Sequence, residues 1–373
     1  MYGAELIDAL RRMQPDAEFF GAGGERMRRA GCEILVDAKD LSVVGITEIL
    51  GHLPKIWGLF HKLIAEADRR RPDVAVVIDS PAFNWRVARE MRKRGVPVAY
   101  YVAPQFWAWR EGRVRLLRKY VDKALVIFPF EEKFYRHRGV NATFIGHPLA
   151  FMREPSITRE AFAEQYSLEL SKPWITLMPG SRRKEVRMNL PTMLGAAEQL
   201  GSKYEFLIPV APTLDESWLK QQVGRQLIHL VSDPRAALLH SRAGIIASGT
   251  ATVEAALMET PFVMVYRVSK LTYLLGKPRV KVPFFAMVNL IADEKVVPEL
   301  VQNEFTTRNV VDRTLEMIED GPIRERMLDK LAKVKRLLTA GSPTRESTQS
   351  AASAEALTPA ERAAKEILAL QHS

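Results

Sequence analysis

The sequence predicts an α/β protein built from two doubly wound domains in tandem. Short runs rich in valine and isoleucine alternate with segments of helical periodicity, a pattern typical of parallel sheets flanked by helices. The second half of the 373-residue chain repeats the plan of the first, and a more polar segment at 151–173 is interpreted as the linker between them. Because ligands of such sheets bind beyond the carboxyl ends of the strands, we expect the functional site in a cleft between the domains.

The first domain is predicted at 1–150, and it opens directly on a helix at 3–13. A doubly wound domain normally begins with a strand and a glycine-rich turn in front of that helix, and the sequence has neither. We therefore expect the first domain to lack its first strand. Strands are predicted at 17–23, 74–80, 96–104, 123–128 and 142–148, and helices at 46–68, 84–94, 110–119 and 131–138.

The second domain is predicted at 174–338. A segment rich in Ser, Thr and Ala at 339–356 is interpreted as a flexible linker. It leads to a final helix at 357–373, for which Thr358 is the expected N-cap and Pro359 suits the first helical position. Strands of the second domain are predicted at 174–181, 204–210, 228–232, 243–248 and 261–267.

Charge and composition narrow the class of partner. A net charge of +10 and a pI of about 9.6 favour an anionic partner, such as a phosphorylated substrate, acidic lipid headgroups or nucleic acid. Cys32 is the only cysteine, which excludes an intrachain disulfide and fits a reducing cytoplasm. No apolar stretch approaches the roughly 20 residues that cross a bilayer, and no signal-peptide or metal-site motif is found. We expect a cytoplasmic protein that contacts a membrane without spanning it and binds no metal.

One strand end in the second half has the residues of an anion site. The strand at 174–181 ends in Gly180 and Ser181 and is followed by a basic helix that begins near Arg182. Backbone N–H groups at a helix start, together with a guanidinium, suit phosphate oxygens. The alternative is a simple turn in front of a solvated basic helix.

A second strand end offers residues for a nucleoside. The strand at 243–248 ends at Ser248, followed by Gly249 and Thr250, and Glu254 lies one turn into the next helix. An acid at this place can accept hydrogen bonds from a ribose diol. Capping by the hydroxyls and stabilisation of the helix dipole by Glu254 explain the same residues equally well.

Candidate acceptor residues lie in the first half. Asp79 directly follows an apolar strand, so it is either a cap of the next helix or a catalytic base. The stretch at 100–120 combines tryptophans with arginines, which suits sugars, nucleobases and lipid interfaces, unless it is a loop packed on its own domain. An apolar stripe at 41–60 with basic residues behind it suits a membrane interface, with core packing as the alternative.

Together these stretches resemble the lipid-A-disaccharide synthase family, membrane-associated glycosyltransferases of Gram-negative bacteria. The match extends from the first helix to about residue 335, and the order and spacing of its motifs make it specific. The motifs are "VVGITEIL", "IDSPAFN", "YYVAPQFWAWR", "FIGHPL", "LMPGSRRKEV", "ASGTATVEAAL" and "VNLIADEKVVPELVQNEFT".

The resemblance implies a GT-B fold, in which two Rossmann-like domains face a cleft, and an inverting transfer without metal or cofactor. The donor would be UDP-2,3-diacylglucosamine and the acceptor 2,3-diacylglucosamine 1-phosphate (lipid X), giving the β-1,6-linked lipid A disaccharide 1-phosphate and UDP. Asp79 would be the base, and Arg182 with helix N-termini would stabilise the departing UDP. Asn289, Glu299 and Gln302 look like further nucleotide-side residues, Trp109 and Arg110 like acceptor-side residues, and Val43, Val44 and Ile46 like lipid contacts.

The same resemblance places the protein at the cytoplasmic face of the inner membrane, with a homodimer as a candidate assembly and no nucleic-acid partner. One departure concerns the amino end, where the family has a strand and a Gly-Glu-x-Ser-Gly-Asp loop before the first helix. The sequence starts after that point, so we expect a misplaced start codon, a poorly folded first domain and slow turnover.

Two other functions are compatible with part of the sequence. A UDP-sugar epimerase of the same architecture would explain Arg182 and Glu254 but not the apolar, basic first domain. A nucleic-acid-binding protein would need its charge in one continuous groove with stacking aromatics, whereas the basic residues here are scattered.

Overall fold

The chain forms two compact units, seen in a computed structural model. The first unit comprises residues 1–151 and 340–373, and the second comprises 152–339. Both are built on parallel sheets, which confirms the predicted α/β class. The structure describes residues 2–41, 46–109, 111–224, 226–269, 282–339 and 357–372, without the side chains of 41, 46–53, 109 and 372.

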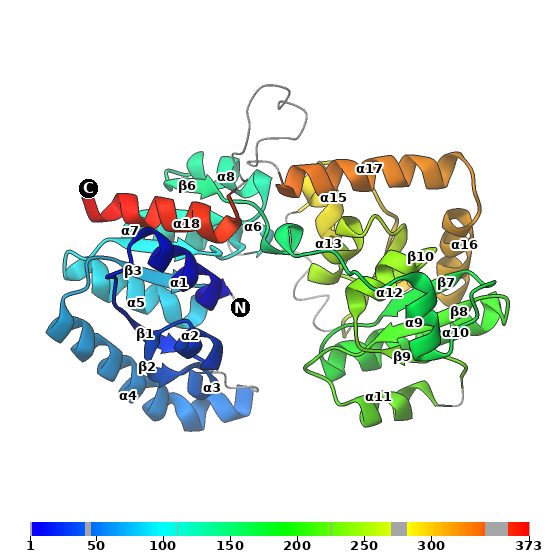
Figure 1. Cartoon of the computed structure of the whole chain (residues 1–373), viewed down its shortest axis with the longest axis horizontal. Helices are drawn as coiled ribbons and strands as arrows, with labels where there is room; N and C mark the ends of the chain where they lie inside the picture. Colours follow the sequence, from blue (N-terminus) through cyan, green and yellow to red (C-terminus); the bar gives the residue numbers. More distant parts are fainter. Residues whose placement is uncertain are drawn as a thin grey trace. The chain divides into compact units, whose positions relative to one another are not determined.

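The first unit is coloured from blue to teal in Figure 1, with its C-terminal helix in red. It contains a four-stranded parallel sheet with the strand order β3-β4-β5-β6. Tyr100 and Tyr101 of β4 and Leu125 of β5 are at most 1% exposed, as expected for central strands covered on both faces. Each strand lies within a predicted range. Their bounds are β3 (Ala75–Ile78), β4 (Val98–Tyr101), β5 (Lys123–Val126) and β6 (Ala142–Phe144).

Three amphipathic helices share a core with this sheet. Phe60 and Ile64 of α4, Val87 and Met91 of α5, and Leu117 of α7 belong to one cluster of buried side chains, together with residues of β3, β4 and β5. Burial of these apolar faces, rather than local propensity, fixes the helices on the sheet. The α-helices between α3 and β6 are α4 (Ile46–Arg70), α5 (Pro81–Lys93), α6 (Phe106–Trp109), α7 (Val114–Tyr120) and α8 (Pro129–Arg136).

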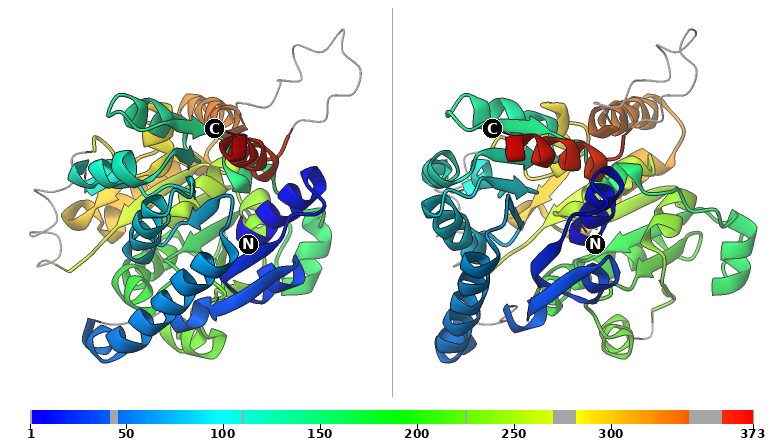
Figure 2. Two further views of the ribbon diagram at one scale, coloured as in Figure 1. Left: turned by 90° about the vertical axis from the view of Figure 1, so that its left-hand side faces the viewer. Right: turned by 60° about the vertical axis from the view of Figure 1, so that its left-hand side comes forward.

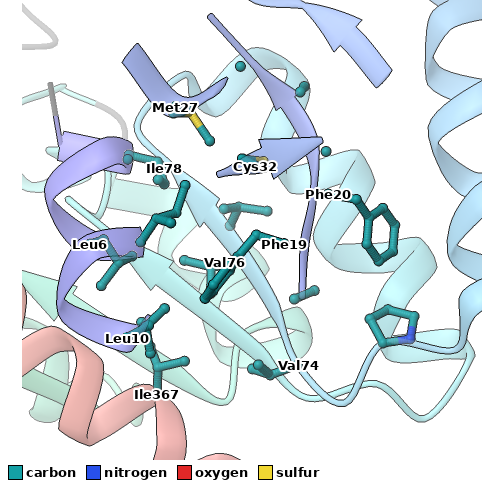
Figure 3. A pocket seen from close by; sticks show the side chains of 18 of the residues that line it. Leu6, Leu10, Phe19, Phe20, Met27, Cys32, Val74, Val76, Ile78 and Ile367 are labelled. Carbon is teal, nitrogen blue, oxygen red and sulfur yellow. The ribbon is translucent and has the colours of Figure 1, made fainter. Parts of the chain in front are cut away.

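A cavity of about 1100 Å³ lies between this sheet and a small sheet of the same unit (Figure 3). The small sheet consists of β1 (Phe19–Gly23) and β2 (Cys32–Asp37). In the described part of the chain β1 pairs only with β2 and β3 only with β4, and both β1 and β3 line the cavity along their whole length. A parallel strand at this place would pair with both edges. An additional strand at this place stays a prediction.

The C-terminal helix α18 (Pro359–Leu368) belongs to the first unit and lies beside α1 (Tyr2–Met13), as both views in Figure 2 show. Arg12 forms an ion pair with Glu361 at 3.2 Å, and Ile367 is fully buried. Thr358 is the N-cap, as predicted, because its side chain accepts a hydrogen bond from the Glu361 backbone N–H. The remaining short helices of this unit are α2 (Glu25–Arg29) and α3 (Ala38–Leu41).

The second unit, coloured from green to orange in Figure 1, contains a six-stranded parallel sheet. Its strand order is β12-β11-β10-β7-β8-β9. Its central strands are mostly apolar, and Ile175, Leu177, Ile245 and Val263 are fully buried. The strands are β7 (Trp174–Met178), β8 (Glu205–Pro209), β9 (His229–Val231), β10 (Ala243–Ala247), β11 (Phe262–Tyr266) and β12 (Glu299–Val301).

The segment 151–173, interpreted as a linker from its polarity, belongs almost entirely to the second unit. It contains α9 (Arg159–Tyr166), from which Phe162 packs with Leu168 and Trp174. A few apolar residues on one helix face are enough to bury the segment, so the unit begins at 152 and not at 174. The other helices are α10 (Arg183–Leu200), α11 (Glu216–Val223), α12 (Pro234–His240), α13 (Thr250–Leu257), α15 (Met287–Ala292), α16 (Thr307–Ile318) and α17 (Pro322–Thr339).

Candidate functional site

The nucleotide-side candidates of the second unit lie at one edge of its sheet. The register pairs Ile246 of β10 with Met178 of β7, so the turns that follow these two strands leave the sheet side by side. β11 and β12 continue the same sheet in the same direction, with Tyr266 paired to Val301 at their carboxyl ends. Parallel strands therefore bring residues 179–182, 248–254 and 299–302 to a common edge, the place where such sheets bind ligands.

The turn after β7 requires the glycine at position 180. Gly180 has a φ of +124°, in the region that favours glycine. A Cβ atom at this position would lie 2.6 Å from the Cβ of Glu185 and 2.7 Å from its Oε2. The chain can therefore bring the start of α10 this close to the strand end only with glycine, whatever the turn binds.

Glu185 is a residue of this turn that the sequence analysis missed. Its Oε2 accepts a hydrogen bond from the Ser181 backbone N–H at 3.0 Å, and its Oε1 pairs with Arg182 Nη1 at 2.7 Å. Arg182 is the N-cap of α10, with an extended φ of −123°, and its side chain is 78% exposed. The guanidinium of Arg182 is therefore paired with a carboxylate of its own chain, that of Glu185. This carboxylate would compete with a ligand phosphate for the same guanidinium.

In the turn after β10, neither Ser248 nor Thr250 caps the following helix. Gly249 is the N-cap of α13, with a φ of +146° and no side-chain cap hydrogen bond. The Ser248 hydroxyl instead donates to the carbonyl of Phe285 at 3.0 Å, and Thr250 is exposed as the first residue of the helix. Neither hydroxyl caps α13, and within its first turn the Thr252 N–H donates to the Gly249 carbonyl at 3.2 Å. The helix start therefore presents its dipole, without a side-chain cap, to an anion at this edge.

Glu254 lies one turn into α13 and is half-buried. Burial raises the pKa of its carboxyl group, while the charge of Arg235 lowers it and that of Asp233 raises it. Both neighbours belong to the start of α12, so Glu254 faces that helix terminus as well as the strand end. A partly buried carboxyl group at this position is better suited to hydrogen-bond a hydroxyl of a ligand than to carry a solvated surface charge.

Asn289 and Glu299 form an internal network. Glu299 accepts hydrogen bonds from the backbone N–H groups of Phe285 and Ala286 and from Asn289 Nδ2, at 2.8–3.1 Å. Asn289 is fully buried, and its Oδ1 accepts from the N–H groups of Val296 and Val297. These two predicted nucleotide-side residues thus fix residues 285–297 in front of β12, and Asn289 has no exposed polar atom to offer a ligand.

Gln302 has the features of a ligand-binding residue. It follows β12 with a φ of +53°, and in the described part of the chain its buried Nε2 has no hydrogen-bond partner. Such a strained residue with an unsatisfied donor is typical of functional sites. Tyr266, at the end of neighbouring β11, is a further residue of this edge, since the charge of Glu185 contributes, after burial, to raising its pKa.

In the first unit, Asp79 lies at the carboxyl end of β3 and is exposed. The cap of α5 is Ser80, which makes no side-chain cap hydrogen bond, and Pro81 occupies the first turn. Among the described residues no hydrogen bond to the Asp79 carboxylate is found, so the capping alternative is not observed. The carboxylate is free to act on a ligand.

Most of the side chains predicted to contact the acceptor or the lipid lie outside the part of the chain that the structure describes. Val43, Val44 and Arg110 are outside the described residues, and so are the side chains of Ile46 and Trp109. The helix α6 that carries Trp109 is anchored by its neighbour Trp107, whose Nε1 donates to Glu131 Oε1 at 2.8 Å. Glu131 is fully buried, and burial raises its pKa to about 7.

The described residues contain neither a metal-binding cluster nor a membrane-spanning helix. No group of three or more His, Cys, Asp or Glu side chains is arranged to hold a metal ion within those ranges. No helix in the same ranges combines the length and apolarity needed to cross a bilayer.

Comparison with solved structures defines the class of the fold. The chain is similar to the glycotransferase of kitacinnamycin, with a TM-score of 0.63 at 14% identity over 99% of this chain and 96% of the other. It is also similar to a UDP-GlcNAc 2-epimerase from Neisseria meningitidis bound to UDP-GlcNAc, with a TM-score of 0.59 at 11% identity over 98% and 95%. The protein has the GT-B fold, which confirms the predicted architecture.

Comparison with sequence families identifies the branch of this fold. The family model for lipid-A-disaccharide synthetase matches residues 1–354. A lipid-A-disaccharide synthase of Koribacter versatilis is 53% identical over 367 residues, which cover 97% of this chain and 96% of the relative. A lipid-A-disaccharide synthase of Acidobacterium capsulatum is 48% identical over 358 residues, which cover 91% of this chain and 90% of the relative. The chain belongs to the lipid-A-disaccharide synthase family, and is thus a glycosyltransferase of lipid A biosynthesis, as predicted from its motifs.

Proposed function

We propose that the protein transfers the sugar of UDP-2,3-diacylglucosamine to the 6-hydroxyl of 2,3-diacylglucosamine 1-phosphate with inversion, and releases UDP. Family membership supports the reaction class, and one structural observation supports the assignment of roles. Asp79 presents an exposed carboxylate at a strand end without using it to cap the following helix. A carboxylate so placed is suited to act as a general base.

The second unit is proposed to bind the donor. The uridine diphosphate would lie at the sheet edge formed by Gly180, Ser181, Arg182 and the start of α13. With no metal in the proposed mechanism, the departing diphosphate needs the guanidinium and the helix N–H groups as its electrostatic partners. Glu254 would accept hydrogen bonds from the ribose diol, and the free Nε2 of Gln302 would donate one to an oxygen of the donor.

The first unit is proposed to bind the acceptor and to carry the base. The 6-hydroxyl of the acceptor gives its proton to the Asp79 carboxylate while its oxygen attacks the anomeric carbon of the donor. The bond to UDP breaks as the new bond forms, and its electron pair leaves on the diphosphate oxygen. A single displacement of this kind inverts the anomeric configuration, which accounts for a β-1,6 product.

A peripheral position on the cytoplasmic face of the inner membrane is part of the proposal. Both substrates carry acyl chains, and the net charge of +10 favours an acidic lipid surface. Trp57 of α4 is 54% exposed and continues the apolar stripe whose earlier side chains are not described. An exposed tryptophan on an amphipathic helix is typical of membrane interfaces.

The reaction is tested by incubating the purified protein with both acylated substrates and determining the linkage of the product by nuclear magnetic resonance. We expect a β-1,6 disaccharide and one equivalent of UDP, unchanged by EDTA, and no product when the acceptor is omitted. A change of the donor sugar without acceptor would support an epimerase, and an α-linked product would exclude a single displacement.

A further inference from the structure

The turn that carries Asp79 has a strained backbone. Asp79 and Ser80 have φ values of +46° and +45°, and they are the only consecutive non-glycine residues with positive φ in the described ranges. Side chains with a Cβ rarely adopt this left-handed conformation, and two in succession persist only where the surroundings hold them. The strain is not explained by helix capping, since Ser80 makes no side-chain cap bond.

Two side chains hold the turn at the carbonyl of Asp79. Asn84 Nδ2 donates to this carbonyl at 2.6 Å and to the carbonyl of Ile78 at 2.8 Å. Tyr100 Oη donates to the same carbonyl at 2.7 Å. The two donors fix the orientation of the peptide that follows Asp79, while the Asp79 N–H donates to Tyr101 O at 3.2 Å.

The two donors come from rigid parts of the unit. Tyr100 lies on the central strand β4, is 1% exposed, and is paired with Val77 of β3 in the sheet. Asn84 lies in the first turn of α5, whose start is fixed by Pro81. The Asp79 turn is thus hydrogen-bonded to the buried strand β4 through Tyr100 and to the helix α5 through Asn84. A movement of its backbone would break both of these hydrogen bonds.

The hydroxyl of Tyr100 also lies close enough to the Asp79 carboxylate for its negative charge to affect the pKa of the tyrosine. Burial raises the pKa of Tyr100, and the negative charge of Asp79 raises it further. The hydroxyl therefore stays protonated and remains a donor over the whole range in which an enzyme works. Its neighbour Tyr101 is equally buried, but in the described part of the chain its hydroxyl has no hydrogen-bond partner.

We propose that Tyr100 and Asn84 are positioning residues that hold the strained turn after β3 and so aim the Asp79 carboxylate at the acceptor hydroxyl. This inference rests on the proposed function, in which Asp79 is the base. Neither residue touches the reacting atoms in this scheme, and each acts through the backbone of Asp79. A base displaced by a fraction of an ångström loses much of its effect on the rate, although substrate binding is retained.

The test compares Tyr100→Phe with Tyr101→Phe. Both variants remove one buried hydroxyl from adjacent positions of the same strand and keep the ring, but only the first removes a donor to Asp79. We expect Tyr100→Phe to lower kcat about tenfold or more, with KM for both substrates and Kd for UDP unchanged, and Tyr101→Phe to keep the wild-type kcat. Asn84→Ala, which removes donors to two carbonyls, should lower kcat further.

Circular dichroism and Tm, measured for each variant, separate a folding defect from a positioning defect. The inference is overturned if Tyr100→Phe and Tyr101→Phe have the same kcat, or if Tyr100→Phe raises KM and leaves kcat intact. Asp79→Asn, assayed beside them, tests the proposed function separately. If that variant turns over normally, Asp79 is not the base, whereas an inactive Asp79→Asn with an unaffected Tyr100→Phe overturns only the positioning role.

Discussion

Two buried ionisable groups of the first unit are expected to give opposite pH dependences of stability. Burial raises the pKa of Glu131 from its ordinary 4.5 to about 7, although three N–H groups donate to its carboxylate. Burial lowers the pKa of His147 from its ordinary 6.5 to about 4. Both groups contact Phe128. Its backbone N–H donates to the Glu131 carboxylate, and the centroid of its ring lies 5.1 Å from the centroid of the His147 ring.

The sign follows from which state holds the proton. Between pH 4.5 and 7 the folded state keeps a proton on Glu131 that the unfolded state has released, so this stabilisation is complete below pH 4.5 and is lost as the pH rises through 7. Between pH 4 and 6.5 the unfolded state protonates the histidine while the folded state does not. The His147 contribution is therefore complete above pH 6.5 and is lost as the pH falls towards 4.

Each difference of about 2.5 pH units corresponds to about 3 kcal/mol, at ~1.4 kcal/mol per unit. In the wild type the two dependences largely cancel between pH 4.5 and 6.5, and single substitutions reveal them. Relative to wild type, Glu131→Gln should gain about 3 kcal/mol of stability as the pH rises from 4.5 to 7. His147→Asn should gain a similar amount as the pH falls from 6.5 to 4.

The assay must report on the first unit alone, because two units need not unfold in one transition. Hydrogen exchange of peptides from β5, α8 and β6, measured from pH 4 to 8 and corrected for the intrinsic rate, gives the opening free energy of this region. Differences from wild type that stay constant with pH, or that have the same sign for both variants, would refute the reasoning.

Two other predictions concern the phosphate turn and the cavity. Arg182→Ala should weaken UDP binding by about 1.5 kcal/mol, the lower end for hydrogen bonds to charged groups, because its guanidinium is 78% exposed. Glu185→Gln removes the competing carboxylate and should tighten UDP binding by up to about 1 kcal/mol in calorimetry, and equal affinities of both variants and wild type would contradict this role. An apolar, strand-forming segment added in front of Tyr2 should fill the cavity between β1 and β3 and raise the Tm, whereas a Gly/Ser segment of equal length should not. Identical Tm values for the two extensions would exclude a strand at this place.

The strands of both sheets were predictable where they are runs of apolar residues. β3 to β11 all lie within predicted ranges, because strands buried on both faces have continuous apolar sequences. β2 and β12 were not predicted. β2 mixes Glu33 and Asp37 with its apolar residues, and the two apolar residues of β12 stand between Glu299 and Gln302, so neither strand shows a continuous apolar run.

The site was predictable at the level of strand ends but not of side-chain partners. Parallel topology alone brings 180–182 and 248–250 to one edge. Glu185 was missed although it stands at the third helical position of α10, where a glutamate commonly reaches back to the backbone N–H groups before the helix. The left-handed conformation of Asp79 depends on hydrogen bonds from Tyr100 and Asn84, and no local sequence rule reports such contacts.

The central claim is that Asp79 removes the proton of the acceptor hydroxyl while a separate unit holds UDP. The most direct measurement compares Asp79→Asn with Asp73→Asn, a control at the opposite end of β3 whose residue is also exposed. We predict that Asp79→Asn lowers kcat by about 100-fold or more and leaves Kd for UDP unchanged, while Asp73→Asn matches wild type in both. Turnover of Asp79→Asn within a few-fold of the control would contradict the account.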